Sequence, residues 1–503
     1  MSLMHLLNRW FLHIFLLPLP IASGFLAPAS VFPQHPPAQR SQSSIPLTHK
    51  QQAQQLFTRA LQLARTLPPD EFGREQVSLK AATLGTIAIQ LAQAGDPQQA
   101  KTVFQEAEMG IRKNLRDWEQ TEALADLAVQ LTEAGFTDAA LKLVTTLSQQ
   151  EWLDDRYYRQ AEALNQIAVQ LIAQGKLEQA QQLVPQILTL ARKISDTAGY
   201  QSNGSCGIWR YEVLTGLAET LAMLHQTQKA IATVKETLSC SAASEGGTNY
   251  QFQGIIAVLK HVKTQQDLLQ MLNAIPTLKP EGNSDQIFHE TAVKAARLDQ
   301  PTLARRATHR IQDKVLKAYT EFTVESYNLR EGDRQKSLNL IRRTEEFYKT
   351  NANELNNVTW LDTLMLPHLA ANVVRIKQPD LLERLQQRDA TGFNDRIAIE
   401  FAKLGETQAA LDLLKMIADV SVWQTVMPYL QTPKALAQAE QIVQSPEFPA
   451  PDYISTRDPI MLSITKQQLR LHQVNAAQAV TRKIIAPEIQ AQALAIVATY
   501  LMT

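Results

Sequence analysis

The chain has 503 residues, with 49 basic and 49 acidic side chains and a formal net charge of zero. This balance argues against nucleic acid as a partner and against a disordered acidic chain. Hydrophobic residues make up 45% of the sequence, enough for a packed core, whereas 18 glycines and two cysteines argue against phosphate loops, disulfide-dense folds and four-thiolate zinc sites.

Residues 1–29 have the pattern of an export signal. Arg9 precedes an apolar run from Trp10 to Leu17, and Ala27-Pro28-Ala29 resembles a cleavage site. An uncleaved membrane anchor is the alternative, and it would be the chain's only membrane contact. Residues 30–47 are rich in Pro, Ser and Gln, which predicts a disordered linker. We therefore expect an exported protein of the periplasm or cell envelope rather than the extracellular medium.

From Gln52 onward, apolar residues recur three and four positions apart, which indicates helices. The triplet Leu91, Gly95 and Ala100 returns 40 residues later, and again after a further 40, as Leu131-Gly135-Ala140 and Leu171-Gly175-Ala180. The leucine closes one helix, the glycine takes a left-handed turn, and the alanine lets the next helix approach closely. One such pair leaves apolar surface uncovered, so neighbouring pairs must stack.

This unit resembles the tetratricopeptide repeat. The family's large, large, small and large positions on the first helix match Leu124, Leu127, Ala128 and Leu131; Gly135 and Ala140 match its turn, and Val144 and Leu147 its second helix. The family's Trp and Tyr positions hold leucine here, Trp152 replaces the usual proline, and the period is 40 rather than 34. The resemblance implies an all-α solenoid of stacked antiparallel helix pairs, a tetratricopeptide-like superhelix.

Weaker copies of the turn extend the prediction to the end of the chain. They are His225 with Ala230, Lys263 with Leu268, Asp299 with Ala304, Gly332 with Asp333, and His472 with Ala477, whereas Gly405 with Ala410 restores the clear pattern. We expect about ten helix pairs over residues 48–503, with interruptions near 200–210, 240–250 and 444–460. A lone helix from Gln490 to Leu501 would cover the final apolar face.

No catalytic, cofactor or metal motif is visible. His289-Glu290 lacks the second histidine of a zinc helix, and neither a nucleophile elbow nor a phosphate loop occurs. We therefore expect no enzyme activity and no cofactor. Cys206 and Cys240 fall in two interruptions at the same end of consecutive helices, so a disulfide and two separate thiols are both compatible with the sequence. A nucleophilic Cys206 would need His225 or His261 as its base.

One basic stripe stands out in the second half. Arg306, Arg310, Lys314 and Lys317 recur at helical spacing, which predicts a shared helix face. Nearby acidic residues favour a solvated outer face over a site for an anionic partner.

In tetratricopeptide-like stacks the first helices line the concave face. By position, this implies that a groove is lined by Thr86, Gln93, Glu122, Asp126, Glu133, Asn165 and Gln166. Their amides could bind a peptide backbone and their carboxylates a basic side chain. The sequence thus predicts an exported, non-catalytic scaffold for a protein or peptide partner. Two alternatives are an enzyme or accessory module with a site near 200–250, and a structural component that assembles end to end.

Overall fold

A computed structural model describes residues 47–67, 75–147, 153–195, 208–237, 250–278, 284–329, 333–350, 373–374, 377, 393–449 and 453–503. Residues 1–46, which carry the predicted export signal and most of the linker, lie outside these ranges, as do Cys206 and Cys240. Within them helices are the only regular secondary structure, and no helix combines the length and apolar character needed to cross a membrane.

The helices alternate along the chain between two kinds. The first helices of successive pairs are α3 (Glu75–Gln93), α5 (Asp117–Glu133), α7 (Leu153–Ala173), α9 (Ile208–Met223), α11 (Tyr250–His261), α13 (Ser284–Arg297), α15 (Lys314–Tyr327), α20 (Phe393–Lys403), α22 (Val420–Val426) and α24 (Tyr453–Arg470). Their second helices are α4 (Pro97–Asn114), α6 (Thr137–Thr145), α8 (Leu177–Lys193), α10 (Thr227–Glu236), α12 (Gln265–Leu278), α14 (Pro301–Thr308), α16 (Arg334–Thr350), α21 (Thr407–Leu414), α23 (Pro433–Gln444) and α25 (Val474–Thr481).

Left-handed residues end the first helices, as the repeat pattern predicts. Gly95, Gly135, Gly175 and Gly405 have positive φ, and so do His225, Asp299 and His472 in the weaker copies. In the clear copies the carbonyl of the motif leucine accepts the N–H of the residue after the glycine, for example Phe136 N to Leu131 O at 2.8 Å. This bond satisfies a carbonyl that the helix end would otherwise leave without a donor.

The alanine of each copy lies where the two helices touch. Seven of these alanines are fully buried: Ala100, Ala140, Ala180, Ala230, Ala304, Ala410 and Ala477. Because a methyl group is the whole side chain, the second helix can pack directly on the first. The predicted pairing is confirmed, since α3 packs against α4, α5 against α6, and α7 against α8.

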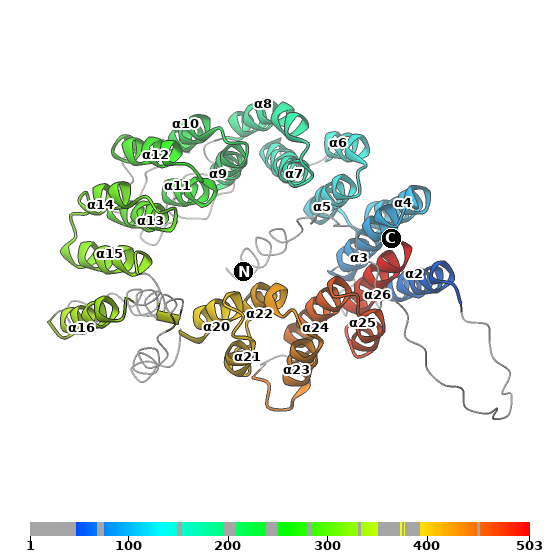
Figure 1. Ribbon diagram of the computed structural model, residues 1–503. Helices are drawn as coiled ribbons and strands as arrows, with labels where there is room; N and C mark the ends of the chain where they lie inside the picture. The colour runs from blue at the N-terminus through cyan, green and yellow to red at the C-terminus, as the bar shows by residue number, and fades with distance from the viewer. Residues whose placement is uncertain are drawn as a thin grey trace, which may run out of the picture.

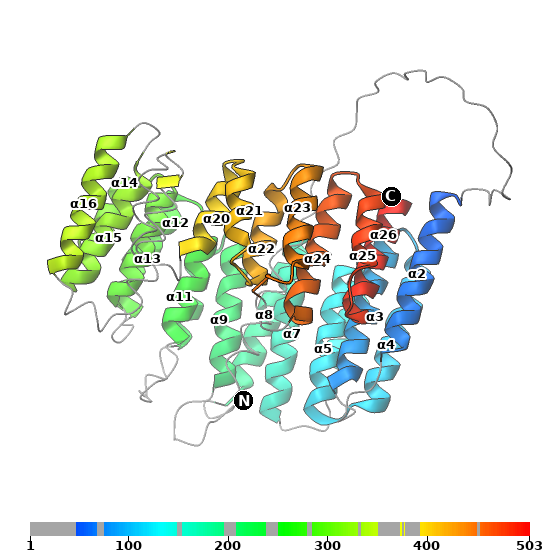
Figure 2. The same ribbon diagram turned by 90° about the horizontal axis from the view of Figure 1, so that it is seen from below.

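The pairs follow a closed curve rather than an open one (Figure 1). First helices line the inside and second helices the outside, and Figure 2 shows the helices standing side by side along a common direction. The C-terminal helix α26 (Pro487–Met502) reaches the N-terminal helix α2 (His49–Arg65) and packs against both α2 and α3. The described helices therefore form a ring in which the first of them, α2, meets the last, α26.

The contact between α2 and α26, which we call the joint, closes the ring with one more helix pair. The inner member, α26, takes the place of a first helix, and the outer member, α2, that of its second helix (Figure 1). One hydrophobic cluster contains both Phe57 of α2 and Leu494 of α26, and Thr499 Oγ1 donates to Gln90 O of α3 at 3.0 Å. The expectation of a lone closing helix is therefore wrong, because α2 covers α26.

The joint also bears on end-to-end assembly. In an open solenoid, each terminal helix pair presents an apolar face that a second copy could cover. Here these two faces cover each other, so this joint offers no free end to another copy.

Three local expectations differ from the structure. The turn at Lys263 is not left-handed; Thr264 instead caps α12, its hydroxyl accepting the Asp267 N–H at 3.1 Å. Helix α24 begins at Tyr453 and contains Pro459, so the loop expected at 444–460 is shorter. The basic stripe does not lie on one helix: Arg306 is on α14, Arg310 in the turn that follows, and Lys314 and Lys317 on α15. Asp313 caps α15 and accepts the Leu316 N–H at 2.6 Å.

Candidate binding surface on the inner wall

The exposed side chains of α5 identify the face that looks into the ring. A stripe of residues spaced three and four apart is partly or fully exposed: Glu119, Glu122, Asp126, Gln130 and Glu133. From Glu122 to Glu133 every residue between these positions is buried. Helix α5 packs against its outer partner α6 and against α3 and α7 on its two flanks. The remaining side, with this stripe, faces the inside of the ring. Four of its five side chains are acidic.

The neighbouring inner helices extend this acidic surface. Glu162 on α7, and Glu212 and Glu219 on α9, occupy the equivalent half-exposed stripe. We call the inner stripes of α5, α7 and α9 the acidic arc. It ends at α11, where the Glu219 carboxylate lies 2.7 Å from Nε2 of His261 and 3.4 Å from Nζ of Lys260. Burial alone would raise the pKa of Glu219, but His261 and Lys260 together hold it below its ordinary value.

Arg159 on α7 is the cation at the centre of the acidic arc. Its guanidinium lies 3.4 Å from Glu162, 3.7 Å from Asp155 and 3.9 Å from Glu122. These separations are longer than those of a tight bidentate pair. Because one guanidinium faces three carboxylates, the cluster of these four side chains has a net negative charge when all of them are ionised.

An aromatic pair, Tyr158 and Trp209, packs next to this charged cluster. Tyr158 is buried, stacks on Trp209 with ring centroids 5.4 Å apart, and donates its hydroxyl to Glu212 at 2.9 Å. Burial raises the pKa of Tyr158 well above its ordinary value. Burial also raises the pKa of Glu212, and the Tyr158 hydrogen bond opposes that change. Tyr158 thus packs between repeats, from α7 onto α9.

Opposite charges face each other near the joint. Burial raises the pKa of Glu133 on α5, and Lys466 on α24 opposes the rise. Burial and the neighbouring Arg470 lower the pKa of Lys466, and Glu133 opposes the fall. The two side chains act on each other electrostatically, although they do not form an ion pair within 4.0 Å.

The structure places all seven predicted groove residues on inner helices: Thr86 and Gln93 on α3, Glu122, Asp126 and Glu133 on α5, and Asn165 and Gln166 on α7. Asn165 has a structural partner, since its Oδ1 accepts the Thr220 hydroxyl of α9 at 2.8 Å. It fits beside α9 because position 216 is glycine, whose missing Cβ would lie 2.7 Å from Asn165 Nδ2. Contact with a ligand stays a prediction for the set.

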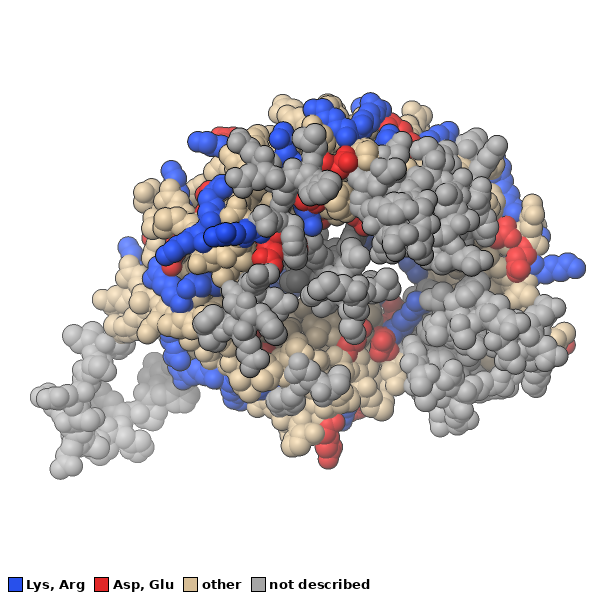
Figure 3. Space-filling view, turned by 180° about the vertical axis from the view of Figure 1, so that it is seen from behind, with Lys and Arg blue, Asp and Glu red and all other residues tan. Residues whose placement is uncertain are grey.

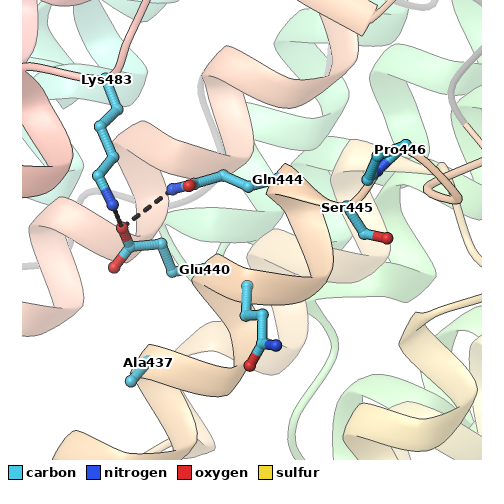
Figure 4. A pocket seen from close by; sticks show the side chains of 7 residues that line it. Ala437, Glu440, Gln444, Ser445, Pro446 and Lys483 are labelled. Atoms are coloured by element: carbon cyan, nitrogen blue, oxygen red, sulfur yellow. Dashed lines mark hydrogen bonds and ion pairs between the residues drawn. The ribbon is translucent and has the colours of Figure 1, made fainter.

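The outer surface carries a pocket near Glu440 and Lys483 (Figure 4). It has a volume of about 520 Å³ and lies between α23 and the end of α25. Lys483 Nζ lies 2.5 Å from Glu440 Oε1, to which Gln444 also donates at 2.9 Å. These polar groups satisfy one another. Elsewhere on the outside, basic and acidic side chains are interspersed along the rim (Figure 3).

Metal chemistry has no visible site in the described ranges, where no group of three or more His, Cys, Asp or Glu residues could hold a metal ion.

Comparison with known proteins finds distant structural likenesses only. No family model matches the chain, and neither does any curated protein. Similar solved structures include Ton1535 from Thermococcus onnurineus (14% identity, 81% of this chain and 98% of that one, TM-score 0.26). Others are the pentatricopeptide repeat protein PPR10 from maize (14%, 88% and 69%, 0.31) and a circular tandem repeat protein (12%, 90% and 96%, 0.24). TM-scores this low bear on neither function nor partner.

The repeating turns, buried alanines and stacked pairs decide the architecture. The chain is a tetratricopeptide-like helical repeat protein. Its repeat register also holds a regularity that the sequence analysis missed. Glu122, Glu162 and Glu212 occupy the same place on α5, α7 and α9, and all three belong to the acidic arc. Each stands two residues before a buried leucine: Leu124, Leu164 and Leu214. By contrast, no local pattern indicated Arg159.

Proposed function

We propose that the protein is an exported, non-catalytic scaffold whose inner wall binds an extended segment of a protein partner. The observation that carries the proposal is the acidic arc, an inner surface over three neighbouring helices where the half-buried Arg159 guanidinium faces three carboxylates. Curved surfaces of stacked helix pairs suit extended segments, because successive helices offer regularly spaced side chains.

The negative charge of the acidic arc indicates which side chains the bound segment presents. Carboxylates that are half-buried and held in excess favour a Lys or Arg side chain, which would form charge-assisted hydrogen bonds with them. We therefore propose that the bound segment presents basic residues to α5, α7 and α9. The notion of export rests on residues 1–29, where Arg9 and the apolar run that follows it have the pattern of a signal peptide. A periplasmic or cell-envelope location follows, with a membrane-anchored form as the alternative.

Capture of the partner with matched charge variants tests this proposal. Glu122→Gln with Asp126→Asn removes two charges from the inner arc, and Asp138→Asn with Glu178→Gln removes two from exposed positions on outer helices. Tagged full-length protein is purified from its native cells, and the recovered partner is quantified. For the inner variant we expect at least a tenfold loss of recovered partner, which corresponds to about 1.4 kcal/mol of binding free energy. For the outer variant we expect little change.

Equal recovery with both variants would contradict binding at the acidic arc. Sequencing the N-terminus of the same preparation tests export: a start near Ser30 supports a cleaved signal, and an intact Met1 on soluble protein contradicts it.

A further inference from the structure

A second charged group lies on the inner helices α13 and α20, away from the acidic arc. Arg396 of α20 has a buried Nη1 with no hydrogen-bond partner. Arg297 of α13 donates through Nε to the Tyr327 hydroxyl at 2.9 Å, and its guanidinium lies 5.3 Å from the centre of the same ring. Neither guanidinium has a carboxylate of the described residues within 4.0 Å.

The surrounding groups show how incompletely this positive charge is compensated. Burial lowers the pKa of Arg396, and the like charge of Arg297 contributes to the fall. Burial raises the pKa of Glu290, with Arg297 and Arg396 opposing it. Burial likewise raises the pKa of Asp395, next to Arg396 on α20. Glu290 acts on both arginines and Asp395 on Arg396, and neither carboxylate supplies an acceptor to Arg396 Nη1.

A guanidinium cannot avoid the cost of a buried charge by losing its proton, because its pKa stays far above neutral pH. A buried donor without an acceptor is destabilising, and sequences ordinarily provide either a partner or an apolar residue. An arginine kept in this state is therefore suited to an acceptor that arrives from outside the chain. The planar guanidinium fork matches the paired oxygens of a carboxylate or phosphate.

We propose that Arg396 and Arg297 bind an anionic group, a carboxylate or a phosphate, on the inner wall. This inference rests on the proposed function where the anion belongs to the bound segment, which would then carry a basic residue for the acidic arc and an acidic one for this site. Tyr327 orients Arg297 through their hydrogen bond, so the two guanidinium groups are positioned from helices α13, α15 and α20.

Direct titration of the purified full chain tests the site without the partner. Binding of inorganic phosphate and of a tetraglutamate peptide is measured at constant ionic strength by calorimetry and by the melting temperature. We expect at least one of the two to bind saturably. Binding of phosphate alone assigns a free anion, and binding of the peptide assigns a carboxylate of the partner.

Two variants separate this site from general charge effects. Arg396→Met should weaken binding at least tenfold, whereas Arg343→Met should leave it unchanged, because Arg343 lies on outer helix α16 and pairs with Glu325 at 2.8 Å. Arg396→Met should also raise the melting temperature of the free protein, since it removes a buried donor that has no acceptor. Arg396→Lys, which keeps the charge but loses the fork, should bind with intermediate strength.

The proposal is overturned if neither anion binds, or if Arg396→Met binds as the parent protein does and melts at a lower temperature, the behaviour of a structural arginine. If Arg396→Met does not fold, Arg396→Lys decides the question in the same assays. Because no partner enters these measurements, their outcome is independent of the capture experiment on Glu122 and Asp126.

Discussion

At the scale of single residues, the left-handed turn between paired helices costs folding free energy when its residue carries a side chain. Gly135 has φ of 87° and an open environment, with no heavy atom within 4 Å of the place a Cβ would occupy. Any cost of a side chain there comes from the backbone alone. His225, Asp299 and His472 show that the ring tolerates this cost at three other turns.

The first prediction compares the same substitution at two glycines. Gly135→Ala should destabilise the protein by about 1 kcal/mol, because alanine disfavours the left-handed conformation. Gly110→Ala should stabilise it by about 0.5–1 kcal/mol, because Gly110 lies inside α4 and its Cβ would also meet open space. Urea unfolding measures both. Changes of the same sign would contradict the assignment of Gly135 as the turn residue.

A second residue-scale feature is the buried His289 on α13. Its Nδ1 lies 2.9 Å from the Thr320 hydroxyl, which itself donates to Leu316 O at 2.7 Å. The threonine has only one proton to donate, so its oxygen accepts from Nδ1–H and the neutral ring carries its hydrogen on Nδ1. Burial, with a smaller contribution from Arg297, lowers the pKa of His289 to about 4.

The second prediction follows from this lowered pKa. The unfolded chain, with a histidine pKa of about 6.5, binds more protons than the folded chain between pH 4 and pH 6.5. Stability is therefore complete above this window and falls by about 3 kcal/mol as the pH drops through it. His289→Asn, which keeps a donor near Nδ1, should flatten that slope, whereas His49→Gln at an exposed position should not. An unchanged slope in His289→Asn would show that other groups cause the acid sensitivity.

At the scale of helices, α2 has a role that its position in the sequence conceals. It is the first described helix of the chain, yet it completes the pair begun by the last one. Its Thr48 cap accepts the Gln51 N–H while the Gln51 side chain accepts the Thr48 N–H, so the helix has a defined start. A helix that merely extended a linker would need neither this cap nor a buried face.

The third prediction tests the coupling between α2 and α26. Phe57 is 5% exposed and belongs to the same hydrophobic cluster as Leu494. Phe57→Ala should destabilise the protein by about 3–5 kcal/mol because it leaves a cavity. Hydrogen exchange should accelerate in α26, far along the chain, as well as in α2. Faster exchange confined to α2 would contradict a shared helix pair.

The helices also show which parts of the structure are visible in sequence. Gly95, Gly135 and Gly175 predicted their turns because backbone conformation depends on local residue type. The stripe of Arg306, Arg310, Lys314 and Lys317 misled because its spacing fits one helix, although the Asp313 cap begins a second. Periodicity alone does not distinguish a continuous helix from two helices separated by a short turn.

At the scale of the whole molecule, closure of the ring was not predictable from the sequence. The contact between α2 and α26 joins segments more than 400 residues apart, as does the bond from Thr499 to Gln90. Closure depends on the small rotation between successive pairs added over the whole stack, and no residue pattern encodes that sum. The seven predicted groove residues could be placed on first helices from the repeat register, whereas Arg159 and Arg396 depend on contacts between repeats.

Closure also determines which surface is distinctive. In an open solenoid both end faces and the concave face are available, whereas in this ring the ends cover each other and the inner wall keeps the acidic arc. Met109 on outer helix α4 is 68% exposed and Asp126 on inner helix α5 is exposed as well, so both sites accept a reporter.

Site-specific photocrosslinking from these two positions in native cells tests the central claim, that the inner wall is the partner-binding surface. A photoreactive residue at position 126 should give a defined product with one protein, and the same residue at position 109 should not. A product of equal yield from position 109, with none from position 126, would place binding on the outer surface and contradict the account.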